Sequence, residues 1–507
     1  MRLSITALAL AMLMSAAEVR ADYPVDFSAS LTAGGGQGSF APYYISSLRG
    51  GRFSGQYNAQ VTGMLSREID KSQRFSYGFG LELAAGYGSS IDYERYDAVS
   101  ATWHTHAVKP SRFFIQQLYG EVKYRGVFLS AGMKERGSAL LNQRLTSGDL
   151  IESGNARPIP QVRVGFIDFQ DVPFTQGWLQ IQGEIGYGKF TDNGWTRDQY
   201  NYYLSHLSTG EWYNYKRCYF RVAPRERFSV TLGMQAAGEF GGNVDWYERG
   251  RLFRSQHRDV KLNTFFKMFL PTEDGSDGYY TGNHLGSWDL QARYRLKSAG
   301  EIKAYFSWPW EDGSGIGKLN GWDGLWGVEY DACRHGVVRG VVVEYLDLTN
   351  QSGPIHYASA DYEGTTLKAE STGADDYYNN TSFGPWANYG FAIGSPAVMS
   401  PLYNTDGFPD FLCNRVRGIH LGLEGDILPC LSYRMKAGYR KAWGNGKLTL
   451  QHTRHLTSVM LEADWKIRRI KGLSLLAQAE IDRGNLPCNS AGVMVTLKYE
   501  GLLNFKK

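Results

Sequence analysis

The sequence contains almost nothing that would let it cross a membrane as a helix. After residue 21 no stretch approaches the ~20 consecutive apolar residues that a transmembrane helix requires, and the mean hydropathy is −0.36. Cysteine is also scarce. The five cysteines lie far apart without a Cys-x-x-Cys pair, so their spacing indicates neither a zinc site nor a dense disulfide framework, and leaves one or two disulfides open. They are Cys218, Cys333, Cys413, Cys430 and Cys488.

Charge of one sign is not in excess, and catalytic motifs are missing. With 54 Lys and Arg against 50 Asp and Glu, the net charge of +4 predicts no nucleic-acid partner. There is no Gly-x-Ser-x-Gly motif and no Cys–His pair that suggests a nucleophile. The pair His104 and His106 has no further metal ligand nearby in the sequence. We therefore expect no enzyme activity, no catalytic residues, no cofactor and no metal.

The N-terminus has the pattern of a secretory signal peptide. Arg2 precedes an apolar stretch from Leu3 to Ala17, and the small residues Val19 and Ala21 suit a signal peptidase. We expect residues 1–21 to be cleaved, which leaves residues 22–507 as the mature protein. A chain that is exported in this way and then enters a membrane without helices must do so as a closed barrel, because lipid cannot hydrogen-bond an open backbone.

Alternation of apolar and polar residues with a period of two is the strongest positive signal, and it continues to the C-terminus. In the last segment Val493, Val495, Leu497 and Tyr499 share one face, and Thr496, Lys498 and Glu500 share the other. Such segments run about ten residues, the length of a tilted transmembrane strand, and several end in Trp or Tyr. A soluble β-sandwich also alternates, but its strands are usually five or six residues long.

The connections between these segments alternate between short and long, as in outer-membrane barrels. Counting the segments predicts an all-β fold: a transmembrane antiparallel β-barrel of about 18 strands. Residues 255–270 have a helical spacing, and we expect them and residues 136–150 to form short helices in a loop or a plug. The long stretch 347–415 is rich in Tyr, Asn, Gly and Ser, and we expect it to fold over or into the pore.

Two of the long connections are rich in aromatic residues and are candidates for sugar binding. Aromatic faces pack against the C–H faces of sugars, while neighbouring Asn, Asp and Arg meet the hydroxyl groups. The candidates are Trp195, Tyr202 and Trp212 in the first connection, and Tyr377 and Trp386 in the second. A membrane-interface girdle, or a loop packed on itself, would explain the same residues.

One run of sequence resembles a known family. SGNARPIPQVRVGFIDFQDVPFTQGWLQIQGEIGYGKFTD, residues 153–192, is similar to the capsule assembly Wzi family of outer-membrane proteins, in its Bacteroidetes-type branch. FAPYYISSLRGGRFSG and GNHLGSWDLQARY resemble it too. The resemblance implies an 18-stranded monomeric barrel in the outer membrane, with a blocked pore. It also implies lectin-like binding of capsular polysaccharide that helps to assemble or attach the capsule.

Within the run that resembles this family, Arg157 and Arg163 are the residues that we single out, because their guanidinium groups can form salt bridges or contact a ligand. An arginine beside the Pro158-x-Pro160 turn can hold a plug through salt bridges or can contact a polysaccharide ligand. The alternative function for the whole chain is a porin-like or substrate-specific outer-membrane channel. A barrel-embedded hydrolase is a weaker third possibility. The first two alternatives differ in whether the pore is open, and long aromatic insertions favour a closed one.

Overall fold

Eighteen antiparallel strands form a closed ring in the computed structural model, which describes residues 25–270, 281–297, 300–311, 313–352, 375–446 and 449–503. The signal peptide expected at 1–21 lies outside the described residues. The barrel strands are β1 (Val25–Gln37), β2 (Asn58–Arg67), β3 (Phe75–Gly88), β6 (Phe113–Tyr124), β7 (Val127–Met133), β8 (Gln161–Phe166) continued by β9 (Gln170–Asp171), β10 (Leu179–Lys189), β12 (Trp212–Val222), β13 (Phe228–Phe240), β16 (Asn283–Arg295), β17 (Glu301–Trp310), β18 (Gly324–Asp331), β19 (Gly340–Asp347), β22 (Val416–Leu428), β23 (Leu431–Gly444), β24 (Thr449–Lys466), β25 (Leu473–Gly484) and β26 (Ser490–Leu503).

The ring closes where the first strand meets the last. β1 pairs with β26 from Val25↔Leu503 to Gln37↔Ala491, so neither strand is left as an edge. β8 and β9 both pair with β10 and act as one interrupted strand, which gives the count of eighteen. The predicted fold class is confirmed. Within the described residues no helix is long and apolar enough to cross a membrane.

The alternation seen in the sequence separates the two faces of the barrel wall. On β24 the outward Val459 is 49% exposed, whereas its neighbour Ser458 is 3% exposed and points inward. Outward positions around the ring are mostly apolar, and inward positions carry buried polar groups such as Gln60, Glu462 and Glu480. An apolar exterior and a polar interior are what a transmembrane barrel requires.

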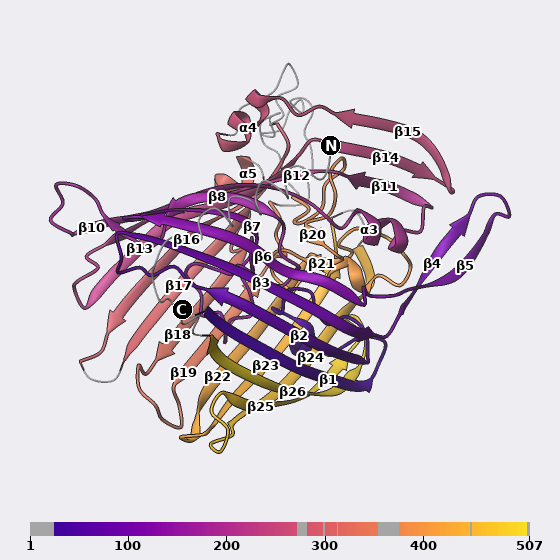
Figure 1. Cartoon of the computed structure of the whole chain (residues 1–507). Helices are drawn as coiled ribbons and strands as arrows, with labels where there is room; N and C mark the ends of the chain where they lie inside the picture. The colour runs from indigo at the N-terminus through magenta and orange to yellow at the C-terminus, as the bar shows by residue number, and fades with distance from the viewer. Residues whose placement is uncertain are drawn as a thin grey trace.

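Short turns lie at one end of the barrel and long connections at the other (Figure 1). The hairpin of β4 (Ile91–Asp97) and β5 (Thr102–Val108) projects from the long-connection end. A three-stranded sheet of β11 (Leu204–Thr209), β14 (Gly242–Glu248) and β15 (Arg251–Arg258) lies at the same end. The remaining elements of the connections are α2 (Tyr43–Ser46), α3 (Asn193–Gln199), α4 (Leu262–Phe269), α5 (Gly313–Ile316), β20 (Ala387–Asn388), β21 (Phe391–Ala392) and the 3-10 helix η2 (Pro401–Tyr403).

Two helix predictions need correction. Residues 136–150 form no helix. They contain one turn, in which the N–H groups of Leu145 and Thr146 donate to the Asn142 carbonyl oxygen, and further backbone groups bond to the barrel wall. In 255–270 only α4 is helical, since residues 255–258 belong to β15 and pair with β14. All five cysteines are free, which settles the question that their spacing left open.

Segment 134–160, which joins β7 to β8, crosses the lumen and bonds to several walls. Glu344 of β19 accepts hydrogen bonds from Thr146 Oγ1 and the Ser147 N–H, both at 2.6 Å. His420 of β22 lies 2.7 Å from the Leu145 carbonyl oxygen, and Gln235 of β13 donates to Asp149 at 2.9 Å. These contacts satisfy polar wall groups that would otherwise be buried without partners.

Two further connections also contact the inner face of the wall or segment 134–160. In segment 38–57 the backbone N–H groups of Tyr44 and Ile45 donate to Glu480 of β25, at 2.7 and 2.8 Å. The described part of the β19–β22 connection, 375–415, is held to segment 134–160 by Asn155, whose Nδ2 donates to the Ala392 carbonyl oxygen at 2.9 Å. We call 38–57, 134–160 and 375–415 together the plug. The expectation that 347–415 folds into the pore therefore holds for its described part.

The hydrogen bonds that Glu344 accepts allow a test of how the plug is held to the wall. Replacing Glu344 with Ala leaves the buried Ser147 N–H without its acceptor, which costs about 1–3 kcal/mol. We expect Glu344→Ala to lower the temperature at which the barrel loses its heat-modifiable mobility on denaturing gels. We also expect it to add current flicker in planar bilayers. Glu500→Ala, which removes an exposed carboxylate on β26, is the control and should change neither. Equal behaviour of the two variants would show that the plug does not depend on Glu344.

Candidate functional site

A cleft of about 310 Å³ opens where the long connections meet. It draws its lining from the β1–β2 connection, from β4, from the β5–β6 and β7–β8 connections, from α3, and from the turn between β20 and β21. Its chemically distinctive residues are Arg52, Tyr93, Lys109, Arg157, Trp195 and Tyr389. The cleft thus joins two of the predicted binding residues, Arg157 and Trp195, which lie in separate connections.

Arg157 lies between two aromatic rings of the cleft. Its guanidinium carbon lies 4.0 Å from the centroid of the Phe114 ring and 4.5 Å from that of Tyr389, so it is held by two aromatic faces. None of the described carboxylates forms an ion pair with it. Burial lowers the pKa of this guanidinium from 12.5, and it remains protonated at neutral pH. By contrast, Arg52 is paired with Glu82 at 2.6 Å and with Glu135.

Trp195 is positioned by a tight turn of the plug. Tyr389 and Gly390 both have positive φ, at 51° and 76°. A Cβ atom on residue 390 would lie 2.3 Å from the Trp195 ring, so glycine is what lets the indole pack against this turn. The turn is fixed by the Tyr389 N–H, which donates to Asp192 at 2.8 Å. The indole also meets the Tyr93 ring edge-on, at 6.3 Å between centroids.

Two buried carboxyls lie behind the cleft, where α3 and the start of β12 pack on the plug. Burial raises the pKa of Asp192 to about 6 and that of Glu211 to about 7. The Arg258 guanidinium, 3.4 Å from Glu211, lowers the pKa of Glu211, while the nearby Asp192 raises it. Both groups therefore tend to be protonated below neutral pH, unlike ordinary surface carboxyls.

Three other predicted binding residues are buried in the barrel interior and are not accessible to a ligand in this structure. Arg163 on β8 is paired with Glu152 at 2.5 Å and with Glu184 at 2.8 Å, so it ties the plug to the wall. The Trp386 indole N–H donates to the Ile151 carbonyl oxygen at 3.1 Å. Tyr377 bonds to Asn320 and Asp323. Each of the three is about 1% exposed.

Tyr202 and Trp212 lie outside the cleft. Tyr202 packs on Tyr200 and Tyr247, at 4.7 and 4.9 Å between ring centroids, beside the sheet β11–β14–β15. Trp212 begins β12 and packs on Phe240 and on Phe265 of α4. Both residues therefore join elements of the long connections to one another or to the wall.

Sequence reasoning missed Tyr93 and Lys109 of the cleft, because β4 and β5 form a hairpin that the alternation pattern did not distinguish from a loop. Tyr389 belongs to the same aromatic connection as Tyr377 and Trp386. The only other feature of the sequence that could have singled out Tyr389 is Gly390, which follows it. His104 and His106 share one face of β5, as an H-x-H pair on a strand would, with ring centroids 6.4 Å apart. The described residues include no group of three or more ligands that could hold a metal ion.

Comparison with solved structures places the fold among outer-membrane barrels. Wzi of Escherichia coli, an outer-membrane protein involved in group 1 capsule assembly and a carbohydrate-binding β-barrel, superposes with a TM-score of 0.56 at 14% identity. The match covers 99% of this chain and 88% of that one. OccK5 (OpdH) of Pseudomonas aeruginosa has a TM-score of 0.45 at 10% identity, covering 95% and 98% of the two chains. Acinetobacter baumannii OccAB2 has a TM-score of 0.46 at 8% identity, covering 95% and 98%.

The closed ring of 18 strands and its similarity to the Wzi structure establish the class: a β-barrel with the architecture of outer-membrane proteins. No protein-family model matches the sequence, and no curated protein matches it.

The raised carboxyl pKa values generate a prediction about pH. In the folded chain Asp192 and Glu211 hold protons at pH values where the unfolded chain has released them, so stability should fall as pH rises from about 4 to about 7. Asp192→Asn keeps an oxygen that can accept from the Tyr389 N–H. Asp192→Asn should reduce the loss in the free energy of unfolding between pH 4 and pH 7 by up to about 3 kcal/mol.

The measurement is the unfolding temperature at pH 4.5, 6 and 7.5. Asp198→Asn, an exposed substitution in the same helix, is the control and should follow the unsubstituted protein. A variant Asp192→Asn with an unchanged pH dependence would show that this carboxyl is not the titrating group.

Proposed function

We propose that the protein is an outer-membrane protein that binds a surface polysaccharide, such as a capsular polysaccharide, in the cleft formed around Arg157 and Trp195. It acts in a lectin-like, non-catalytic manner and helps to assemble or attach that polysaccharide. Residues 1–21 are cleaved during export, and the mature barrel works as a monomer surrounded by outer-membrane lipid.

The cleft is the observation that carries this proposal. It combines the half-buried rings of Trp195 and Tyr389 with the cations Arg157 and Lys109 and the exposed carboxylate Asp198. Aromatic faces suit the C–H faces of sugars, and charged groups around them suit hydroxyl or carboxylate substituents. In outer-membrane barrels the long connections face the outside of the cell. That orientation would open the cleft toward surface glycans.

The filled lumen favours this function over a porin-like channel. The plug bonds to β13, β19, β22 and β25, which lie on different parts of the wall. Arg163 and Glu344 sit at the contacts between wall and plug, where a channel would need open water. The similarity of the fold to a carbohydrate-binding barrel points the same way.

Two substitutions in the cleft test polysaccharide binding directly. Trp195→Ala removes the aromatic face, and Arg157→Gln removes the cation. Each should weaken binding to the strain's purified surface polysaccharide by about tenfold, the effect of losing roughly 1.4 kcal/mol. Binding is measured by biolayer interferometry with the detergent-solubilised protein, after gel mobility has shown that each variant is folded.

A matched control and a competing site sharpen this test. Trp322→Ala removes an indole that is 75% exposed and lies away from the cleft, and it should bind as the unsubstituted protein does. If instead Tyr202→Ala abolishes binding while Trp195→Ala has no effect, the ligand binds at the β11–β14–β15 sheet and the cleft assignment is wrong.

A cellular experiment tests the role in attachment. A strain that lacks the gene should still make the polysaccharide but release more of it into the medium, and the unsubstituted gene should restore retention. Complementation with Trp195→Ala should restore the barrel in the membrane without restoring retention. Unchanged retention in the deletion strain would argue against the attachment role. In that case a stable conductance in planar bilayers would support the channel alternative.

A further inference from the structure

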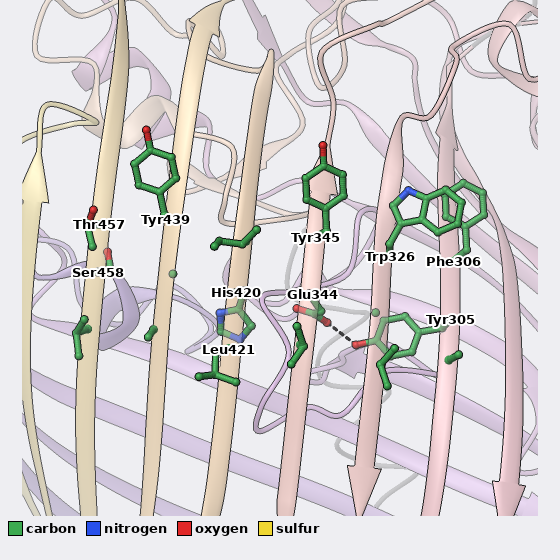
Figure 2. Close-up of a pocket in the computed structure, with 18 of the residues that line it drawn as sticks. Tyr305, Phe306, Trp326, Glu344, Tyr345, His420, Leu421, Tyr439, Thr457 and Ser458 are labelled. Atoms are coloured by element: carbon green, nitrogen blue, oxygen red, sulfur yellow. Dashed lines mark hydrogen bonds between the residues drawn. The ribbon is translucent and has the colours of Figure 1, made fainter.

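The outer wall of the barrel carries a broad apolar hollow of about 950 Å³. It spans β16 to β19 and β22 to β24, and its outward residues are exposed on the face that would meet lipid. Small side chains form its floor: Ala292, Ala304 and Ala437. In Figure 2 the rings of Phe306, Trp326, Tyr345 and Tyr439 lie in one band across the strands. The hollow is therefore a concave apolar surface bordered on one side by an aromatic band.

Strand register places the residues of this wall in rows. The aromatic band follows the pairs Phe306↔Trp326 and Trp326↔Tyr345, continues through Ile419, and ends at Ile419↔Tyr439. The row nearer the short turns is small and apolar, and it contains the pairs Val343↔Leu421, Leu421↔Ala437 and Ala437↔Val459. The strands of a transmembrane barrel are tilted, so each row follows the strand register and runs obliquely across the wall.

The next row toward the long connections is basic. Arg417 pairs with Lys441, and Lys441 pairs with His455, so three nitrogen-bearing side chains stand next to one another on β22, β23 and β24. Arg483 of β25 continues the register row of the aromatic band, opposite Thr457, which pairs with Tyr439. All four of these residues project outward, and Arg417, His455 and Arg483 are exposed.

The acidic groups near this row neutralise only part of its charge. Asp347 of β19 forms an ion pair with Arg417 at 2.8 Å. Lys441 forms no ion pair with a described carboxylate, and its ammonium nitrogen lies 5.3 Å from the centroid of the Trp443 ring. The row therefore leaves an uncompensated cation at the edge of the apolar hollow.

Several other strands of the wall lack this arrangement. On β26, β1, β2 and β3 the outward residues near the same ends of the strands are uncharged: Ala491, Gly35, Ala59 and Tyr87. Lys189, at the end of β10, is a single exposed lysine 5.4 Å from the Trp212 ring, without a basic row beside it. The hollow, the aromatic band and the basic row thus coincide on the side formed by β16–β19 and β22–β24, and not on β26, β1, β2 and β3.

From this juxtaposition we infer that the wall formed by β16–β19 and β22–β25 binds a phosphate-bearing glycolipid with several acyl chains, in the outer leaflet of the membrane. The acyl chains occupy the hollow and the phosphates meet Lys441, His455 and Arg417. Basic clusters at the headgroup level recognise anionic lipids, and aromatic rings sit at the interface between chains and headgroups. This inference rests on the orientation given in the proposed function, with the long connections outward, and not on polysaccharide binding.

Native mass spectrometry of the whole protein in detergent can measure this binding. The probe is a bisphosphorylated, hexa-acylated glucosamine disaccharide, compared at equal concentration with phosphatidylglycerol and phosphatidylcholine. The disaccharide lipid should be retained at higher collision energy than phosphatidylglycerol, and phosphatidylcholine should be lost first. Equal retention of the three lipids would mean an unspecific lipid annulus only and would overturn the inference.

Substitutions test the two halves of the site separately. Lys441→Gln together with His455→Gln should weaken binding of the glycolipid by about fivefold or more, since one lysine near a lipid phosphate contributes about that factor. Lys189→Gln is its matched control, because it also removes a lysine beside a tryptophan, and it should have no effect. Ala437→Phe should fill the hollow and reduce binding, whereas Ala33→Phe on the outward face of β1 should not.

The outcomes separate this inference from the proposed function. Loss of glycolipid with intact polysaccharide binding in Lys441→Gln/His455→Gln supports a distinct lipid site. Glycolipid binding that survives both this variant and Ala437→Phe overturns the inference, whatever the cleft variants show. Selective retention of phosphatidylglycerol over the disaccharide lipid would also overturn it, because a simple anionic phospholipid would then be the ligand.

Discussion

The pairing of β1 with β26 is the constraint on which the rest of the structure depends. In a bilayer each strand must find backbone partners on both sides, and closure is the only arrangement of strands that leaves no edge. Once the ring is closed, the alternation of side chains fixes an apolar exterior and a polar interior along every strand. The two faces then pose separate problems, because one meets lipid and the other must satisfy charged and polar groups away from bulk water.

The plug supplies the hydrogen-bond and ion-pair partners that the polar groups of the inner face require. Glu344 and Glu480 are buried in the wall. Glu344 accepts hydrogen bonds from the Ser147 N–H and the Thr146 hydroxyl, and Glu480 accepts them from the N–H groups of Tyr44 and Ile45. Arg163 plays the complementary part, since it binds one carboxylate of the wall and one of the plug. Positive and negative side chains on the inner face of the wall therefore do not indicate a water-filled pore here, because the chain itself supplies their partners.

The fold could be predicted from the sequence because strand alternation is local, whereas the plug and the site depend on contacts between distant residues. A short helix is expected in residues 136–150, yet some of their carbonyl and N–H groups bond to β19, β22 and β23, which lie about 200 residues or more further along the chain. Residues 255–258 are strand because β14 offers them a partner. Arg157 and Arg163 look equivalent in sequence, and only the positions of Glu152 and Glu184 show that one is neutralised while the other is not.

Aromatic residues illustrate how the same chemistry takes different roles in different surroundings. Trp386 is enclosed by the plug and packs as a core residue, whereas Trp195 is half-buried and packs closely against Gly390 at the cleft. On the outer wall Trp443 lies beside Lys441, as Tyr389 lies beside Arg157 at the cleft. A cation next to an aromatic face suits an anionic or hydroxylated ligand in both places. What differs is the neighbouring surface: connections exposed to water around the cleft, and an apolar hollow below the row of Lys441. The same kind of contact thus occurs beside water at the cleft and beside an apolar surface on the wall, and this difference is the reason for proposing a glycan site in the connections and a lipid site on the wall.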